Sequence, residues 1–465
     1  MKMCDDKKMH IPRILISGTS SGCGKTTVAS AVIKALVNRG LKVGTQKCGP
    51  DYIDPMFHAA ITGDKGSNLD SFFFDDETLR FLLQNKAKDK DINIIEGAMG
   101  FYDGIGMSEK GSAYDISKRI NCPAVLTAPA NGASLSTLAL IDGFISFYPD
   151  NLICGVILNR CTPGIYEELS KEIKKRFKKR VLPLGFMPYM PKCSLESRHL
   201  GLVTAREVDG LNEKLKMLSC QAEKSIDLDA VIKLANEAEP LDNANIAAPR
   251  FESVRIGVAR DEAFCFYYED SLSLLECMGA ELVDFSPLHD KKLPEGICGL
   301  YLGGGYPELY AQGLCKNTSM LISVKSALSD RLPCIAECGG FMYLTKSIGE
   351  YPMAGFFDGK CFDTGRLSRF GYIELTAKHD NMLCRKGEKI RAHEFHYWDC
   401  GSSGDSFEAR KPSGRVWSGV FATDRLYAGY PHFHFYSNID FAVNFYKACL
   451  EEKHKNDRKH RAFGN

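Results

Sequence analysis

Short apolar runs alternate with helix-length amphipathic segments along the first half of the chain. One run occupies residues 13–17 and ends in glycine and small polar residues. In the segment that follows, apolar residues recur at three- and four-residue spacing from Val28 to Leu36, and Gly40 provides a stop, so the pattern predicts a helix. Helix-length segments separate four further β-like runs: KVGTQ, INIIEG, PAVLTA and ICGVILN. This alternation predicts a parallel sheet with helices on both faces.

The pattern changes near the middle of the chain, where residues 223–250 become polar and rich in Ala and Asn. A second series of strands and helices follows, from VRIGVARDE through LPCIAECGG. A chain of 465 residues is also too long for one typical core. We therefore predict two α/β domains, at 1–235 and 251–450, joined by a linker at 236–250. The basic tail at 451–465 is expected to be solvated and disordered.

Composition narrows the possible partners. The 59 basic and 58 acidic side chains give a net charge of +1, which provides no electrostatic reason to expect nucleic acid. Polar residues interrupt the apolar stretch at 124–147, so it predicts a strand and a helix, and no membrane partner is expected. Eighteen cysteines without a regular framework, after a polar N-terminus, indicate reduced thiols in a cytoplasmic protein. The pattern sets no oligomeric state, and a homodimer is one option.

The segment GTSSGCGKTT, residues 18–27, lies between the first predicted strand and the first predicted helix. Its glycines allow backbone N–H groups to converge on phosphate oxygens, Lys25 can reach the terminal phosphates, and Thr26 can bind Mg²⁺. Gly18 stands one residue too early for a strict GxxxxGK motif, an arrangement that resembles dethiobiotin synthetases. The residues predicted to bind ATP are Gly22, Gly24, Lys25, Thr26, Thr27 and Asn159.

Two carboxylates are candidates to complete a magnesium site with Thr26. Glu96 ends the strand-like run INIIEG, and Asp51 follows another predicted strand, so both belong at the carboxyl edge of the sheet. A helix cap or a solvated loop acid is the alternative for each. Asn159 closes the run GVILN and could read the adenine edge, although an end-of-strand turn residue is the alternative.

A second candidate site centres on Cys338, which stands between an apolar strand and a predicted helix in PCIAECGGFMYL. A thiol at such a turn faces the helix N-terminus, which favours the thiolate, and the turn is the cysteine counterpart of a nucleophile elbow. The backbone N–H groups predicted to form an oxyanion hole belong to Gly304, Gly305 and Gly339. His432 or His434 could act as the base. The alternative is that Cys338 merely fills the core.

These features together resemble the triad amidotransferases, whose nucleophile lies on an elbow and whose histidine comes from a late segment. Those enzymes commonly carry a glutamate two residues after the histidine. His434 occupies that position here, so the resemblance implies a Cys–His dyad or another orienting residue. A glutaminase in the same chain as a phosphate loop predicts an ATP-dependent amidation: ATP converts a carboxylate to an acyl phosphate, which ammonia then attacks.

An ordered set of motifs extends this resemblance over nearly the whole chain: KCGPDYIDPMFH, EGAMGFYDG, SRHLGL, VARDEAFCFYY, FSPLHD, LGGGYPELYA, AECGGFMYL and HEFHY. They resemble the signatures of the cobyrinic acid a,c-diamide synthase family. The resemblance implies a dethiobiotin-synthetase-like P-loop domain followed by a class I glutamine amidotransferase-like α/β domain. It implies ATP, L-glutamine and a corrinoid or other tetrapyrrole carboxylic acid as substrates, with Mg²⁺ as cofactor. The reaction implied is amidation of the a- and c-acetate side chains in cobalamin biosynthesis.

The same resemblance implies roles for individual residues. Cys338 is the nucleophile and His432 its activator, whereas Asp51, Glu96 and Asp103 belong to the synthetase site. Without the family, Asp103 is as readily an Asp–Gly turn residue. Arg198 and His199 could face substrate carboxylates or pair with neighbours.

Several alternatives remain at this point. The two histidines of HEFHY suggest a metal site, but no third ligand is evident, so a structural or domain-contact role is favoured. Cobyric acid synthase is organised alike, and diamidation of hydrogenobyrinic acid or nickel-sirohydrochlorin uses the same chemistry. A nucleotide-dependent partitioning or regulatory protein with a vestigial amidotransferase domain is a rival from another class. The intact Cys338, followed by two late histidines, argues against that rival.

Overall fold

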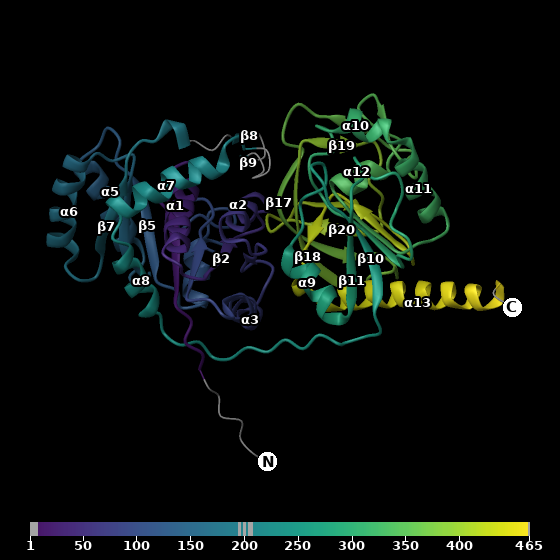
Figure 1. Ribbon diagram of the computed structural model, residues 1–465, viewed down its shortest axis with the longest axis horizontal. Coiled ribbons are helices and arrows are strands. Elements are labelled where there is room, and N and C mark those ends of the chain that lie inside the picture. The colour runs from purple at the N-terminus through teal and green to yellow at the C-terminus, as the bar shows by residue number, and fades with distance from the viewer. Residues whose placement is uncertain (1–7, 194–196, 199–200, 203–207, 464–465) are drawn as a thin grey trace, which may run out of the picture. The chain divides into compact units, whose positions relative to one another are not determined.

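The chain folds into two compact units, Met1–Ile246 and Ala247–Asn465 (Figure 1). This computed structural model describes residues 8–193, 197–198, 201–202 and 208–463. The boundary between the units lies inside the segment 236–250 that the sequence predicts as a linker. Among the described helices, none combines the length and the apolar character needed to cross a bilayer.

Unit 1 is built on a seven-stranded sheet with the order β3-β2-β4-β1-β5-β6-β7, in which every pairing is parallel. The strands of this unit are β1 (Arg13–Gly18), β2 (Val43–Cys48), β3 (Asn68–Leu69), β4 (Ile92–Glu96), β5 (Ala124–Pro129), β6 (Ile153–Asn159), β7 (Leu182–Met187) and the separate pair β8 (Ser197–Arg198) and β9 (Gly201–Leu202). The predicted parallel sheet is confirmed. Its strand order brings the carboxyl ends of β1, β2, β4 and β6 to one edge.

Helices connect the strands of unit 1 (Figure 1). They are α1 (Lys25–Asn38), α2 (Ile53–Thr62), α3 (Asp76–Ala87), α4 (Ala113–Arg119), α5 (Leu135–Phe147), α6 (Pro163–Phe177), α7 (Leu211–Ser225) and α8 (Leu228–Asn236). In α1 the apolar residues at three- and four-residue spacing, Val28, Val32 and Leu36 among them, are completely buried. Each such side chain contributes roughly 1.5–3 kcal/mol, so this packing fixes the helix that follows the phosphate loop.

Unit 2 contains a mixed six-stranded sheet with the order β11-β10-β12-β13-β23-β22, parallel except for the last pairing. Its strands are β10 (Val254–Ala259), β11 (Ala280–Phe285), β12 (Gly299–Leu302), β13 (Cys334–Glu337), β22 (Phe421–Ala422) and β23 (Leu426–Gly429). The helices of the unit are α9 (Glu269–Met278), α10 (Ala311–Lys316), α11 (Thr318–Ser329), α12 (Gly339–Leu344) and α13 (Ile439–Phe463). The second α/β series is thereby confirmed.

Smaller sheets complete unit 2. An antiparallel sheet contains β17 (Arg369–Ala377), β18 (Lys389–His396), β20 (Phe407–Arg410), β21 (Val416–Gly419) and β24 (His432–Phe433). A four-stranded sheet contains β14 (Ser347–Ile348), β15 (Tyr351–Pro352), β16 (Lys360–Asp363) and β19 (Trp398–Cys400). In the antiparallel sheet, β24 pairs with β18 so that His432 lies opposite His393.

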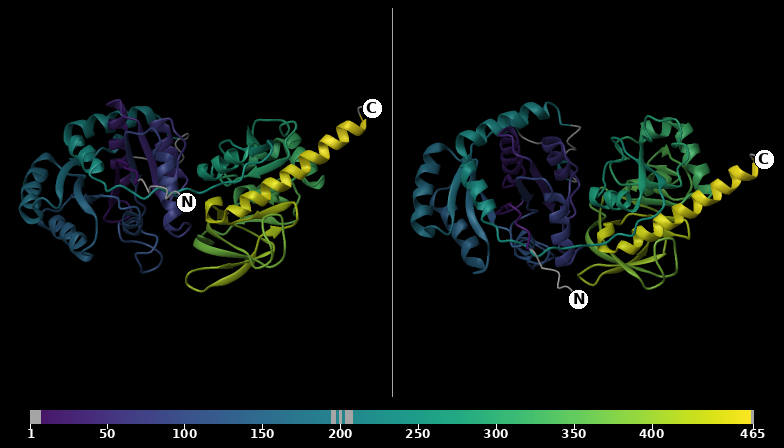
Figure 2. Two further views of the ribbon diagram at one scale, coloured as in Figure 1. Left: turned by 90° about the horizontal axis from the view of Figure 1, so that it is seen from below. Right: turned by 60° about the horizontal axis from the view of Figure 1, so that its bottom comes forward.

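The C-terminal segment differs from its predicted state. The sequence predicts disorder at 451–465, but α13 continues as helix to Phe463, as Figure 2 shows. Lys453 Nζ lies 2.5 Å from Glu252 Oε1, and Lys455 pairs with Glu452 three residues earlier at 3.2 Å. The pair of Lys455 with Glu452 lies along the helix, and the pair of Lys453 with Glu252 ties the helix to the segment before β10, so the run of charged residues is compatible with helical structure.

Candidate functional site

The phosphate loop lies between β1 and α1, where the sequence predicts it. Gly22 and Gly24 have φ angles of 74° and 96°, in the left-handed region that favours glycine. A Cβ on Gly24 would lie 1.9 Å from Asn159 Nδ2, so the loop and the end of β6 can approach this closely only with glycine. Lys25 folds back over the loop and donates to the Ser20 carbonyl at 2.8 Å. Thr27 is half-buried in the first turn of α1.

Asn159 holds the phosphate loop from below. Its side-chain amide donates to the Cys23 carbonyl at 2.8 Å. The side chain is buried, at 5% exposure. Its contact in the structure is therefore with the loop backbone, and its predicted contact with adenine stays a prediction.

Thr26 and Glu96 meet directly at the carboxyl edge of the sheet. The Thr26 hydroxyl donates to Glu96 Oε1 at 2.6 Å, and Glu96 Oε2 lies 2.7 Å from His58 Nε2. Lys47 Nζ, from the end of β2, lies 3.2 Å from Glu96 Oε1 and donates to the Gly97 carbonyl at 3.0 Å. The side chains of Glu96 and His58 are completely or almost completely buried. Thr26 and Glu96, which the sequence predicts as Mg²⁺ ligands, are therefore adjacent, and their role as ligands stays a prediction.

The electrostatics of this cluster follow from burial and close charge. Burial by itself would raise the pKa of Glu96, but the Lys47 ammonium and the hydrogen bonds from His58 and Thr26 lower it below its usual range. Burial would lower the pKa of Lys47, whereas Asp54 and Glu96 raise it. Burial is also the main cause that lowers the pKa of Lys25. Glu96 is thus an anion and Lys47 a cation.

Asp54 belongs to this cluster, although the sequence reasoning missed it. Its Oδ2 atom lies 2.5 Å from Lys47 Nζ and 3.4 Å from the Thr26 hydroxyl. Asp51, the residue predicted instead, accepts hydrogen bonds from the backbone N–H groups of Ile53 and Asp54 at the start of α2. The signal was in KCGPDYIDP, where the second aspartate lies one helical turn after the first. Asp51 as a metal ligand stays a prediction.

The oxygen atoms of the cluster fit the donors that Mg²⁺ prefers, because Thr26, Asp54 and Glu96 present a hydroxyl and two carboxylates. Lys47 already shows that a cation is accommodated beside both carboxylates. Over the described ranges, no group of three or more His, Cys, Asp or Glu side chains forms a metal-binding cluster.

Asp103 closes the turn after β4. Its Oδ2 atom accepts from the Gly100 N–H at 2.9 Å, and the carboxylate is exposed. The turn role that the sequence allows is therefore present, and its substrate role stays a prediction. His199 and the side chain of Arg198 lie outside the residues that the structure describes.

Cys338 occupies a strained turn between β13 and α12. Its φ and ψ angles are 48° and −101°, in a region that residues with a Cβ rarely adopt. The Cys338 N–H donates to the Gly429 carbonyl at 2.7 Å, and a Cβ on Gly340 would lie 2.1 Å from the Leu302 carbonyl oxygen. This backbone is that of a nucleophile elbow, as the sequence predicts.

The predicted oxyanion-hole glycines gather around this elbow. A Cβ on Gly339 would lie 3.2 Å from the Gly305 amide nitrogen, so the β12 loop and the elbow are in close contact. A Cβ on Gly304 would lie 2.4 Å from His432 Cε1. The loop can therefore pass the imidazole only without a side chain. The three glycines and His432 share one site with Cys338, and the donor role of the glycines stays a prediction.

His432 is the histidine that faces the nucleophile. Burial would lower its pKa, but its hydrogen bond with Cys338 and the nearby Glu337 carboxylate raise the pKa of His432 to about 10. His432 Nδ1 lies 3.8 Å from Glu337 Oε2. The imidazole of His432 therefore lies beside the thiol and binds a proton readily, as a thiolate–imidazolium pair requires.

His434 and the histidines of HEFHY have other positions. His434 Nδ1 accepts from the Tyr436 N–H at 3.2 Å, and burial lowers the pKa of His434 to about 3. On β18, His396 stacks on Tyr430 with 3.9 Å between ring centroids, and Glu394 lies 3.7 Å from Arg369. These buried side chains pack within unit 2, in agreement with the structural role predicted for HEFHY.

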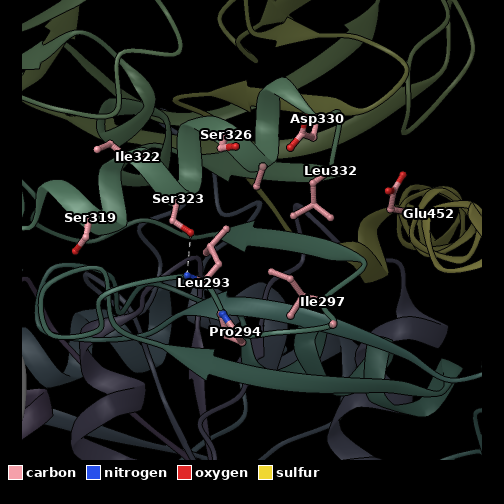
Figure 3. Close-up of a pocket in the computed structure, with 12 residues that line it drawn as sticks. Leu293, Pro294, Ile297, Ser319, Ile322, Ser323, Ser326, Asp330, Leu332 and Glu452 are labelled. Carbon is pink, nitrogen blue, oxygen red and sulfur yellow. Dashed lines mark hydrogen bonds between the residues drawn. The ribbon is translucent and has the colours of Figure 1, made fainter. Parts of the chain in front are cut away.

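A pocket in unit 2 lies apart from these residues (Figure 3). It is lined by Leu293, Pro294, Ile297, Ile322, Leu332 and Glu452, among others. Ser323 accepts from the Leu293 N–H at its wall, at 3.2 Å. None of the predicted site residues lines it.

Comparison with known proteins places both units. Residues 14–203 match the family model described as the CobQ/CobB/MinD/ParA nucleotide binding domain, and residues 255–439 match the CobB/CobQ-like glutamine amidotransferase domain. A cobyrinate a,c-diamide synthase of Clostridium acetobutylicum is 40% identical over 434 residues, which cover 92% of this chain and 98% of that protein. The chain belongs to the cobyrinate a,c-diamide synthase family. Its predicted class, a glutamine-dependent ligase that forms carbon–nitrogen bonds, is confirmed with the family.

Other members of the cobyrinate a,c-diamide synthase family match over similar lengths. The protein of Thermoplasma volcanium is 38% identical over 463 residues, or 97% of this chain and 100% of that protein. The protein of Caldanaerobacter subterraneus is 38% identical over 443 residues, covering 94% and 98%. The resemblance read from the ordered motifs therefore extends over both units.

Proposed function

We propose that this chain uses ATP and L-glutamine to amidate the a- and c-acetate carboxylates of cobyrinic acid in cobalamin biosynthesis. The observation that carries the proposal is that Cys338, on its strained elbow beside His432, shares one chain with a phosphate loop whose Thr26 meets Glu96. Ammonia released by a glutaminase is useful only where a second site consumes it. The choice of cobyrinic acid as the substrate rests on the family relatives, which match over nearly their full length.

In the glutaminase half, the Cys338 proton moves to His432 and the thiolate attacks the side-chain carbonyl carbon of glutamine. The backbone N–H groups of Gly305 and Gly339 would stabilise the resulting oxyanion. The carbon–nitrogen bond then breaks, His432 returns the proton to the departing nitrogen, and ammonia leaves. Water hydrolyses the thioester to glutamate and restores the thiol.

In the synthetase half, a substrate carboxylate oxygen attacks the γ-phosphorus of ATP, and the bond to ADP breaks. The backbone N–H groups of the loop and Lys25 would stabilise the charge that moves during this transfer. Ammonia then attacks the acyl phosphate, and inorganic phosphate leaves. The balance is one carboxylate, one ATP, one glutamine and one water to one amide, one ADP, one phosphate and one glutamate.

Thr26, Asp54 and Glu96 would hold Mg²⁺ in this site, because their oxygen atoms lie together at the carboxyl edge of the sheet. When bound, the ion supplies positive charge next to the phosphates. Asp51 remains a candidate ligand at the start of α2. Asp103 would face the substrate from its exposed turn, and Asn159 would approach the adenine while it supports the loop.

Hydrogenobyrinic acid and nickel-sirohydrochlorin are alternative substrates, because their side chains allow the same chemistry. A regulatory or partitioning role is disfavoured, since a vestigial domain has no reason to keep Cys338 on a strained elbow next to His432. Most of the described cysteines carry buried thiols, which suits a reducing cytoplasm.

The test is to measure glutamate and ADP on addition of ATP, Mg²⁺ and glutamine, with and without cobyrinic acid. We expect both products to rise together only with this corrinoid, and mass spectrometry to count two new amides. If only a metal-free or nickel tetrapyrrole supports turnover, the proposed reaction stands but the proposed substrate is wrong. No turnover with any of these acids would overturn the proposal.

A further inference from the structure

The glutaminase site lacks an acidic residue at the position where a triad would place it, two residues after His432. His434 stands there, completely buried. Its Nδ1 atom accepts from the Tyr436 N–H at 3.2 Å, and its ring lies against Tyr268 with 4.8 Å between centroids. Because that nitrogen caps the turn at 435–437, His434 does not orient His432.

The residue directly before the nucleophile in the sequence brings a carboxylate close to His432. Glu337 is the last residue of β13, directly before Cys338, and is 2% exposed. Its Oε2 atom lies 3.8 Å from His432 Nδ1. Since β13 pairs with β23 in parallel, the strand that carries Glu337 runs beside the strand that leads to His432.

Two hydrogen bonds fix the Glu337 carboxylate in this orientation. Tyr301 donates its hydroxyl hydrogen to Oε2 at 3.1 Å, and the Phe433 N–H donates to Oε1 at 3.1 Å. Phe433 is the residue after His432, so the same carboxylate holds the backbone of β24 and faces the imidazole. A buried carboxylate accepts up to about four hydrogen bonds, so room remains for one from Nδ1.

We propose that Glu337 is the positioning residue that orients His432 toward Cys338 and stabilises its imidazolium form. The inference rests on the proposed glutaminase function of this site. With Nδ1 turned toward Glu337, Nε2 is left to exchange the proton with the Cys338 thiol. This is the arrangement by which a buried acid holds a catalytic histidine in the correct tautomer. The orienting acid thus comes from the residue before the nucleophile.

Other titratable groups near His432 have different protonation states or partners. They are Cys338 on the elbow and His393, Glu394 and His396 on β18. Burial lowers the pKa of His393 to about 3 and that of His396 to about 4, so both are neutral near pH 7. Burial raises the pKa of Glu394 to about 7, and its carboxylate lies beside Arg369.

The test compares Glu337→Gln with the matched control Glu452→Gln, a buried glutamate of α13 paired with Lys455. Glutamine-dependent amidation by Glu337→Gln should fall by about tenfold or more, while its ammonia-dependent amidation stays within about twofold of wild type. The control should retain both activities. Equal use of glutamine by wild type and Glu337→Gln would overturn the inference, whereas a wild-type enzyme that cannot use glutamine would overturn the proposed function instead.

A second readout separates positioning from a general structural role. The rate at which diazo-oxo-norleucine, a glutamine-like electrophile, labels Cys338 should be followed against pH by mass spectrometry. Loss of the negative charge lowers the pKa of His432, so the alkaline limb of the labelling profile should move to lower pH in Glu337→Gln and stay in place in Glu452→Gln. If Glu337→Gln does not fold, Glu337→Asp decides: it keeps the charge but withdraws it from Nδ1, and a labelling rate equal to wild type at every pH would contradict the inference.

Discussion

In each of the two candidate sites, a buried glutamate lies beside a basic side chain: Glu96 beside Lys47, and Glu337 beside His432. Glu96 faces Lys47 at 3.2 Å, and Glu337 faces His432 at 3.8 Å. Removing one partner of a buried ion pair leaves an uncompensated charge, which costs about 3–5 kcal/mol. Substitutions that remove these charges therefore need a control for stability as well as an activity assay.

The residue-scale prediction concerns Asp54 and Asp51. Asp54→Asn should lower amidation about 10- to 100-fold with glutamine and with ammonia, and should raise the Mg²⁺ concentration needed for half-maximal rate. The reason is that Asp54 lies beside Thr26 and Lys47, whereas Asp51 accepts backbone bonds at the start of α2. Asp51→Asn keeps a side-chain oxygen that can accept these bonds, so it should cost little stability and affect the Mg²⁺ requirement less. A larger effect of Asp51→Asn on that requirement would restore Asp51 as the principal ligand.

At the scale of elements, the sequence predicts local motifs better than it predicts which distant strands become neighbours. The phosphate loop and the Cys338 elbow were predictable because each lies in one continuous strand–turn–helix segment. Asp54, His58 and Glu337 were not, because their roles depend on which strands become neighbours. Glu337 is adjacent to the nucleophile in the sequence, but only the parallel pairing of β13 with β23 brings it close to His432. The helical tail was mispredicted because charge alone does not decide between helix and disorder.

Three buried histidines, two on β18 and one directly after β24, predict an acid sensitivity of unit 2. Burial lowers the pKa of His393 and His434 to about 3 and that of His396 to about 4, below the ordinary value near 6.5. The unfolded chain therefore binds protons at these three histidines between about pH 6.5 and pH 4 that the folded chain does not, so the histidines make stability fall as the pH falls through this window. Glu308 and Glu394, whose pKa burial raises to about 7, act in the opposite direction.

The measurement is the thermal midpoint of unfolding across that pH range. His396→Phe, which keeps the ring that stacks on Tyr430, should reduce the slope with pH. The replacement also removes the bond between His396 and the Trp398 carbonyl, so the comparison uses the slope and not the absolute midpoint. An unchanged slope would show that His396 binds protons in the folded state.

At the scale of the whole molecule, separate clusters of buried apolar residues lie in each compact unit, and unit 2 contains at least two of them. Two compact units with their own cores predict two thermal transitions, each sensitive to the ligand of its own unit. A ligand at 100 times its Kd stabilises the unit that binds it by about 2.7 kcal/mol. Addition of Mg²⁺ with ATP should raise one transition only, and labelling of Cys338 by the glutamine-like electrophile should affect only the other.

Differential scanning calorimetry checks this prediction, with Lys25→Ala as the control for the nucleotide effect. Lys25 belongs to the phosphate loop of unit 1, whereas Cys338 belongs to unit 2, so replacement of Lys25 should abolish the ATP shift alone. A single transition that responds to both ligands would mean that the two units unfold as one.

The central claim is that one chain makes ammonia at Cys338 and consumes it at the phosphate loop. The most direct measurement is amidation of cobyrinic acid by Cys338→Ser, with glutamine and with ammonium chloride as alternative nitrogen sources. The account predicts that glutamine-dependent amidation is lost, while ammonia-dependent amidation and its ADP formation remain near the wild-type rate. Continued use of glutamine by Cys338→Ser, or the absence of ATP-dependent amidation from either nitrogen source in the wild-type protein, would contradict it.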